Sequence, residues 1–117
     1  MEGIQLEERK ALGALLDTQS QESVMARIPQ FHTAETDNFV EPPKTVPEAL
    51  GVLMFNMERG VNLEEIREFL RDCPDIQPFY LILANELDDG CARSGNKNTA
   101  RALAKAFGLN YAWGLEL

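Results

Sequence analysis

The sequence predicts an all-α fold: a single domain of about five helices around one core, with a long irregular loop between the first two helices. Apolar residues recur at helical spacing through much of the chain. Asn, Pro and Gly stand where such segments begin and end. The 117 residues, 44% hydrophobic and 26% charged, have the size and composition of one globular domain. The domain is therefore expected to span residues 1–117.

The first helix is expected over residues 6–17, where leucines form one apolar stripe. Residues 18–46 are predicted to be mostly irregular loop with a short helical turn at 21–28, because they are rich in Gln, Ser, Thr and Pro. Two interpretations of this loop stay open. It is either a segment held on the core by Phe31 and Phe39 or a loop that contacts a partner.

The second helix is expected to run to about Arg59. Thr45 to Glu48 fits a capping box, with Pro47 in the first turn. Gly60 is expected to end the helix in the left-handed conformation. Apolar residues cover nearly the whole circumference of this segment, which predicts a buried helix.

The third helix is expected to begin after Asn62 as its cap and to stop before Pro74. The fourth is expected over residues 76–87, again with little polar circumference, so it is also predicted to be buried.

The fifth helix is expected over residues 97–107. Asn96 or Asn98 would cap its start, and Gly108 would end it. The remaining residues, 109–117, form an apolar tail that contains a tyrosine, a tryptophan and two leucines besides Leu109.

Charge is distributed unevenly. Residues 1–91 carry seven Lys and Arg against eighteen Asp and Glu, whereas residues 92–117 carry four against one. Where the chain is helical, the four bases and three of the acids form one basic and one acidic ridge. We weigh three interpretations: the ridges pair with each other, they are unrelated solvated faces, or the basic ridge meets an acidic partner. The basic ridge is Arg93, Lys97, Arg101 and Lys105, and the acidic ridge is Glu64, Glu68 and Asp72.

Binding to nucleic acid is predicted to be unlikely, because the net charge is −8. The stretch from Asn62 to Glu68 resembles parts of helix-turn-helix regulators, but its helix carries four carboxylates, which a major groove would repel. A transcriptional regulator that uses the basic C-terminal helix remains the alternative function.

No catalytic, cofactor-binding or metal-binding residues are predicted. The chain has one histidine, and no phosphate loop or dinucleotide fingerprint is present. Counted as a calcium loop from Asp88, the twelfth position is Thr99, where a Glu is required. Cys73 and Cys91 are expected to be reduced thiols. With no signal-peptide pattern and no long apolar run, the sequence predicts a cytoplasmic protein without membrane attachment.

The function predicted is that of a small acidic, non-enzymatic regulatory protein that binds another protein. It would be an adaptor, an inhibitor or an accessory factor encoded by a phage or mobile element. A homodimer or a protein complex is expected, because two all-apolar helices and the tail exceed what one small core can bury. The competing view is a monomer in which residues 31–40 cover the fourth helix. The predicted interface residues are Phe79, Tyr80, Leu83, Tyr111 and Trp113.

Overall fold

The structure, a computed structural model, describes residues 4–76 and 78–115. These residues form a mixed α/β fold, with four α-helices and four strands in two sheets. The predicted all-α fold, a helical bundle, is therefore wrong. The chain divides into two compact units: the described residues up to Thr36 together with those from Ala112 onward, and Asp37–Tyr111.

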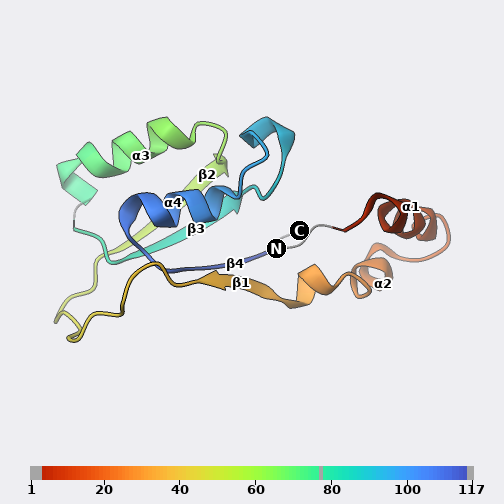
Figure 1. Cartoon of the computed structure of the whole chain (residues 1–117), viewed down its shortest axis with the longest axis horizontal. Helices are drawn as coiled ribbons and strands as arrows, with labels where there is room; N and C mark the ends of the chain where they lie inside the picture. The colour runs from red at the N-terminus through yellow and green to blue at the C-terminus, as the bar shows by residue number, and fades with distance from the viewer. Residues whose placement is uncertain (1–3, 77, 116–117) are drawn as a thin grey trace. The chain divides into compact units, whose positions relative to one another are not determined.

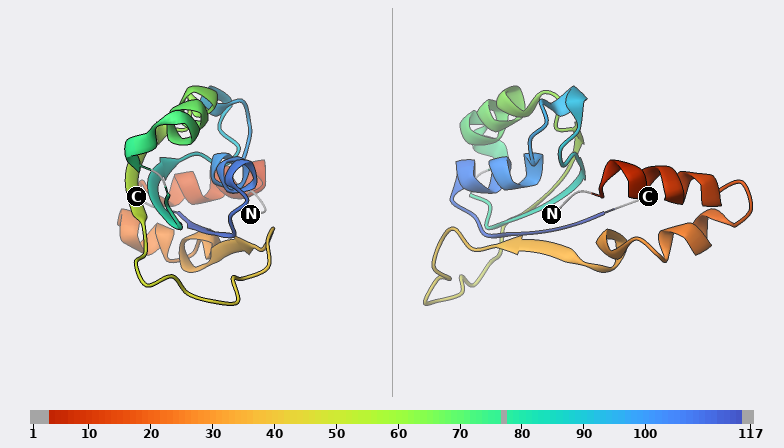
Figure 2. Two further views of the ribbon diagram at one scale, coloured as in Figure 1. Left: turned by 90° about the vertical axis from the view of Figure 1, so that its left-hand side faces the viewer. Right: turned by 45° about the vertical axis from the view of Figure 1, so that its right-hand side comes forward.

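The first unit contains two helices that lie beside each other (Figure 2). The predicted helix at 6–17 and the helical turn at 21–28 are both confirmed, with shorter bounds. Residues 29–44, for which no period was found, include a short strand that pairs with part of the predicted tail. The elements are α1 (Leu6–Leu15), α2 (Gln21–Met25), a 3₁₀ turn (Pro29–His32), β1 (Ala34–Asp37) and β4 (Tyr111–Gly114), the last two reaching into the second unit by one residue each.

The second unit is built on a parallel pair of strands joined through a helix, which is a βαβ connection. The register pairs Val52 with Leu81 and continues to Asn56 opposite Asn85. It then shifts, so that Arg59 lies opposite Leu87. The elements are β2 (Val52–Arg59), α3 (Leu63–Asp72), β3 (Leu81–Leu87) and α4 (Thr99–Phe107), with 3₁₀ turns at Pro74–Ile76 and Ala92–Ser94.

Strands β2 and β3 occupy the segments predicted as the second and fourth helices. Side-chain exposure alternates along both strands with a period of two. Strands of a parallel sheet are apolar on both faces, so they show the same continuous apolar run as a buried helix. No helix begins at Thr45 among the described residues, so the predicted capping box is also wrong.

The core of the second unit lies between the sheet and its two helices. Its buried residues are Met57 of β2, Leu63 and Leu70 of α3, and Leu103 of α4. Figures 1 and 2 show α3 and α4 on the same side of β2 and β3. One face of this sheet is therefore covered by helices.

The predicted third and fifth helices are confirmed as α3 and α4. Asn62 stands at the start of α3, although its side chain makes no capping hydrogen bond. At the start of α4, the side chain of Asn98 accepts a hydrogen bond from the Arg101 backbone N–H at 2.8 Å. Gly108 follows α4 with φ of 61°, as its predicted role requires.

The irregular segment before β2 is attached to the end of α4 by one asparagine. The side-chain oxygen of Asn110 accepts hydrogen bonds from the backbone N–H groups of Phe39 and Val40, at 2.8 and 2.9 Å. Its side-chain nitrogen donates to the carbonyl of Val40 at 2.9 Å. The Phe39 ring stacks on Tyr111 with centroids 5.8 Å apart. These contacts support the interpretation in which Phe39 holds the loop.

Candidate functional site

The carboxyl ends of β2 and β3 meet at one edge of the sheet, because the two strands are parallel. Open parallel sheets bind ligands outside this edge, where the chain leaves the strands. Polar residues lie near the carboxyl ends of both strands: Asn56, Glu58 and Arg59 on β2, and Glu86 on β3. We call these four residues the carboxyl-edge cluster.

Three of these residues have a backbone conformation that side chains disfavour. The φ angles of Glu58, Arg59 and Glu86 are 46°, 68° and 55°, and Gly60 follows with φ of 70°. Positive φ is uncommon outside glycine, and such strain is concentrated at functional sites. These positive φ angles break the regular alternation of side chains at Glu58, Arg59 and Glu86, where regular pairing of the two strands ends.

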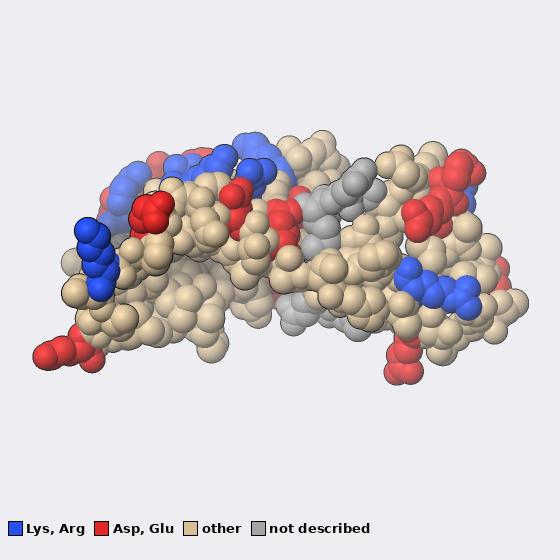
Figure 3. Space-filling view, turned by 60° about the horizontal axis from the view of Figure 1, so that its bottom comes forward, with Lys and Arg blue, Asp and Glu red and all other residues tan. Residues whose placement is uncertain are grey.

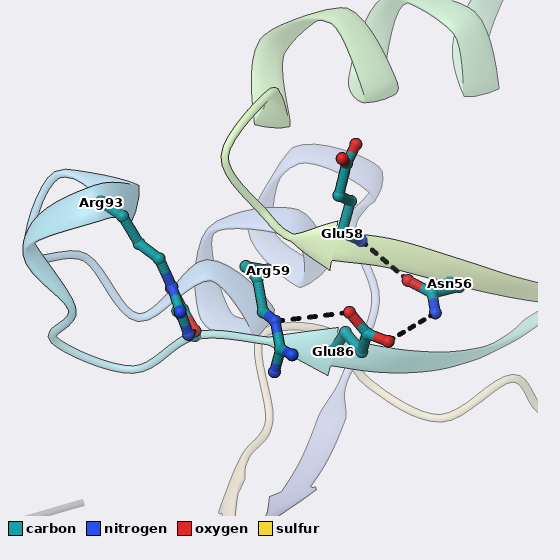
Figure 4. Close-up of polar contacts among 6 residues, drawn as sticks. Asn56, Glu58, Arg59, Glu86 and Arg93 are labelled. Carbon is teal, nitrogen blue, oxygen red and sulfur yellow. Dashed lines mark hydrogen bonds and ion pairs between the residues drawn. The ribbon is translucent and has the colours of Figure 1, made fainter.

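The side chains of the cluster are in contact with one another (Figure 4). The Asn56 amide donates a hydrogen bond to one oxygen of Glu86 at 2.8 Å. The other oxygen of Glu86 lies 3.4 Å from Nε of Arg59. The Asn56 side-chain oxygen accepts from the Glu58 backbone N–H at 2.9 Å. A carboxylate, an amide and a guanidinium thus converge from two strands.

The cluster is accessible to solvent. The Arg59 side chain is 52% exposed and that of Glu86 is 35% exposed. The distance of 3.4 Å between Arg59 and Glu86 is longer than a good charged hydrogen bond, so the ion pair between them is weak. The side chains of Arg59 and Glu86 are therefore both open to solvent and only weakly held together.

A second ion pair supports the same edge from β3 onward. Arg93 donates to both oxygens of Asp88 at 2.7 Å, and the side chain of Asp88 is only 7% exposed (Figure 4 labels Arg93). The hydrogen bond from Arg93 lowers the pKa of Asp88, although burial acts in the opposite direction. Asp88 is therefore held as a carboxylate just after β3.

The backbone of Asp88 connects this pair to α4 and β2. Its carbonyl accepts hydrogen bonds from the hydroxyl and the backbone N–H of Thr99, at 2.7 and 2.9 Å. Thr99 is fully buried, and its side chain lies against Gly60. A Cβ at Gly60 would stand 2.8 Å from Cβ of Thr99. The ends of both strands and the start of α4 are thus packed together.

The carboxyl-edge cluster offers few ligands for a metal ion. Within residues 4–76 and 78–115, no three His, Cys, Asp or Glu side chains are grouped closely enough to enclose a metal ion. A cation that keeps several of its waters needs fewer protein ligands, and Mg²⁺ is usually bound through one or two carboxylates together with the phosphates of its ligand.

The structure separates the residues predicted as a partner interface. Tyr80 and Leu83 are 52% and 46% exposed. Phe79 packs edge-on against Phe107 at 5.5 Å, and Tyr111 stacks on Phe39. Trp113 is half-buried in β4. Leu83 alone of the five lies on the face of the β2–β3 sheet that the helices leave uncovered.

The predicted basic ridge is divided between several elements. Arg93 belongs to a 3₁₀ turn and Lys97 precedes α4, so only Arg101 and Lys105 share a helix. Arg101 pairs with Asp37 at 2.9 Å. The Arg101 and Lys105 charges lie 5.9 and 5.2 Å from the Phe39 ring centroid. These bases contact groups of their own unit, whereas the acids Glu64, Glu68 and Asp72 lie on α3.

Sequence reasoning missed the carboxyl-edge cluster because its two segments were assigned to helices. A signal was present in each segment, since a continuous apolar run ends in an asparagine at Asn56 and Asn85. Polar residues directly after a buried parallel strand mark the ligand-binding edge. Recognition of both segments as parallel strands would have placed their carboxyl ends, and with them Asn56 and Glu86, at one edge of the sheet.

Comparison with known proteins gives no assignment: no family model matches the chain, and no curated protein or solved structure is significantly similar to it. In the described part of the chain, no helix combines the length and the apolar character needed to cross a bilayer.

Proposed function

We propose that the carboxyl-edge cluster binds a hydrated divalent cation of the Mg²⁺ type together with a phosphate-bearing ligand. The observation that carries this proposal is the contact between the Asn56 amide and the half-exposed Glu86 carboxylate at the carboxyl edge of a parallel sheet. Glu86 offers carboxylate oxygens, which Mg²⁺ prefers as ligands. Asn56 now faces Glu86 with its amide nitrogen, so its side chain would have to turn away from the Glu58 N–H before its oxygen could bind the cation.

The small number of protein ligands favours Mg²⁺ over cations that need a complete protein cage. Mg²⁺ retains several waters and is commonly held by one or two carboxylates plus the phosphates of its ligand. On binding, the cation would replace Arg59 beside Glu86 and turn the Asn56 oxygen toward itself. Affinity for the cation alone is therefore expected to be weak and to increase when a phosphate compound is present.

Arg59 is the residue that fits the phosphate. Its side chain is half exposed, and its ion pair with Glu86 is long enough to be given up at little cost. A guanidinium released from Glu86 would present two parallel N–H groups, a geometry that matches phosphate oxygens. The cation and Arg59 together would neutralise a doubly charged phosphate group.

Titration with Mn²⁺, followed by its electron paramagnetic resonance signal, tests the proposal. Wild-type protein is expected to bind one Mn²⁺ at the site, more tightly when inorganic pyrophosphate is added. Glu86→Gln should weaken this binding at least about tenfold, because it removes the only carboxylate of the site that faces Asn56. The control Glu48→Gln removes the same charge from the loop before β2. Equal affinities for the two variants would contradict the proposal.

Protein binding is the second candidate function, and the exposed apolar face of the β2–β3 sheet favours it. Val52, Met54, Leu81 and Leu83 are 40–76% exposed on that face.

The alternative regulator that binds nucleic acid is less well supported, because Arg93 and Arg101 are already paired with Asp88 and Asp37. A cytoplasmic location also remains a proposal, supported by the two cysteines, which are both free.

A further inference from the structure

Within the second unit, helices cover only one face of the β2–β3 sheet. Residues Leu53, Phe55, Ile82 and Ala84 point to the core side and pack on it. The alternate residues form what we call the open face. Its apolar members are Val52, Met54, Leu81 and Leu83, with exposed fractions of 49%, 76%, 40% and 46%.

An uncovered face is unusual for a parallel sheet. Such sheets occur almost only with both faces covered, and α3 and α4 cover only one face here. The four side chains leave roughly 400 Å² of apolar surface in water, in the range of the largest patch on a typical monomer, which is often functional. A further layer on this side would bury this apolar surface.

The distribution of charge restricts which surface can pack on the open face. Residues 52–56 and 81–85 contain no ionisable side chain, whereas the whole chain has a net charge of −8. On the face that Figure 3 shows, most charged side chains in the left-hand part lie along its upper rim, with further ones at the left edge and the lower left, and a broad uncharged area lies between them. Two copies of this acidic chain repel each other over most of their surface, and a neutral patch is where they approach at least cost.

We propose that a second copy of the chain covers the open face, with the two sheets packed face to face about a twofold axis. In such an interface the same patch serves both copies, so a neutral apolar face is complementary to itself. The four apolar side chains would form its centre, and Asn56 and Asn85, paired in register, would lie at its polar rim. A stable interface buries about 800 Å² of surface on each partner, so the four apolar side chains would account for about half of the buried area.

This dimer differs from the one predicted from sequence alone. Only Leu83 is common to both interfaces, because Phe79 and Tyr111 already pack against rings of their own unit. The dimer shares only Asn56 with the carboxyl-edge cluster, and its apolar centre contains none of the residues of that cluster, so the dimer and cation binding are tested separately.

Light scattering coupled to size-exclusion chromatography tests the dimer from low to high micromolar concentration. Wild-type protein is expected to have twice the chain mass of 13.1 kDa. Met54→Lys and Leu83→Lys should each have the mass of one chain, because they place a charge at the centre of the interface. The control Val46→Lys alters a residue that is 84% exposed outside the sheet and should remain a dimer.

A milder substitution distinguishes loss of the dimer from loss of folding. Met54→Gln retains the shape of the side chain at a position that is 76% exposed, so the monomer should fold, as far-ultraviolet circular dichroism can verify. Its dimer should dissociate at a concentration at least tenfold higher than the wild-type dimer. The proposal is overturned if wild-type protein is a monomer at the highest concentration. It is equally overturned if the folded Met54 and Leu83 variants remain dimers.

Discussion

At the carboxyl edge, Gly60 has no room for a side chain. Its φ of 70° is a conformation that favours glycine, and Thr99 fills the space where a Cβ would stand. The positive φ predicted from sequence is confirmed, but Gly60 follows strand β2 and not a helix. A single methyl group here affects the ends of both strands through Thr99 and Asp88.

Gly60→Ala is expected to lower the free energy of unfolding by about 1–3 kcal/mol, because conformational strain and the contact with Thr99 add together. Gly90→Ala is the matched control, since Gly90 has φ of 71° but no atom within 4 Å of the added Cβ. Urea denaturation should show a larger loss for Gly60→Ala. Equal losses would mean that contact with Thr99 contributes nothing.

Asp88 gives the stability of the protein a predictable dependence on pH. Its pKa is lowered in the folded state, chiefly by the hydrogen bond from Arg93. The stabilisation is therefore complete above the ordinary aspartate pKa of 3.8 and is lost as the pH falls through the lower folded value. Asp88→Asn should cost about 1–3 kcal/mol at neutral pH.

Urea denaturation of wild-type protein and Asp88→Asn across the acidic range measures this effect. The difference between their free energies of unfolding should narrow as the pH falls below 3.8. Arg93→Gln removes the other partner and should show the same narrowing. A difference that stays constant with pH would show that the carboxylate charge is not what stabilises this turn.

At the scale of elements, local signals predicted the helices and failed for the strands. The Asn98 cap and Gly108 set the bounds of α4 within the sequence itself, so α4 was predictable. The apolar runs of β2 and β3 are continuous, and only pairing between distant segments decides that they are strands. The same reasoning explains why Thr45 and Glu48 resemble a capping box although no helix follows them.

Thr45→Ala is consequently expected to change the free energy of unfolding by less than about 0.5 kcal/mol, the usual effect at an exposed position outside regular structure. The sequence alone predicted a loss of roughly 0.5–2 kcal/mol from a missing cap. Thermal or urea denaturation distinguishes the two values, and the larger one would indicate that a helix begins at this threonine.

Asn110 connects the irregular segment at residues 38–50 to the end of α4. Asn110→Ala removes all three of its hydrogen bonds to Phe39 and Val40. The amides of these two residues should then exchange with deuterium at least about tenfold faster, because their protection depends on this side chain. Asn38→Ala is the control in the same segment. Unchanged exchange in Asn110→Ala would contradict the attachment described above.

At the scale of the whole molecule, the sequence was sufficient to predict three of the five expected helices and the helical turn that is α2. The carboxyl-edge cluster was beyond it, because Asn56 and Glu86 are thirty residues apart and meet only through the register of two parallel strands. The open face could not be predicted from the sequence either. Its residues can be assigned to one face only after the two segments are known to be strands, in which side chains alternate with a period of two.

Broadening of backbone amide signals by Mn²⁺ in two-dimensional NMR tests most directly whether Asn56 and Glu86 hold a cation. At substoichiometric Mn²⁺, the amides of Asn56, Glu58 and Glu86 are expected to broaden first, because all three lie at the carboxyl edge. Glu86→Gln should abolish this local broadening and leave the rest of the spectrum intact. Broadening centred on the acidic residues of α3, or spread evenly over the acidic surface, would contradict a cation site at this edge.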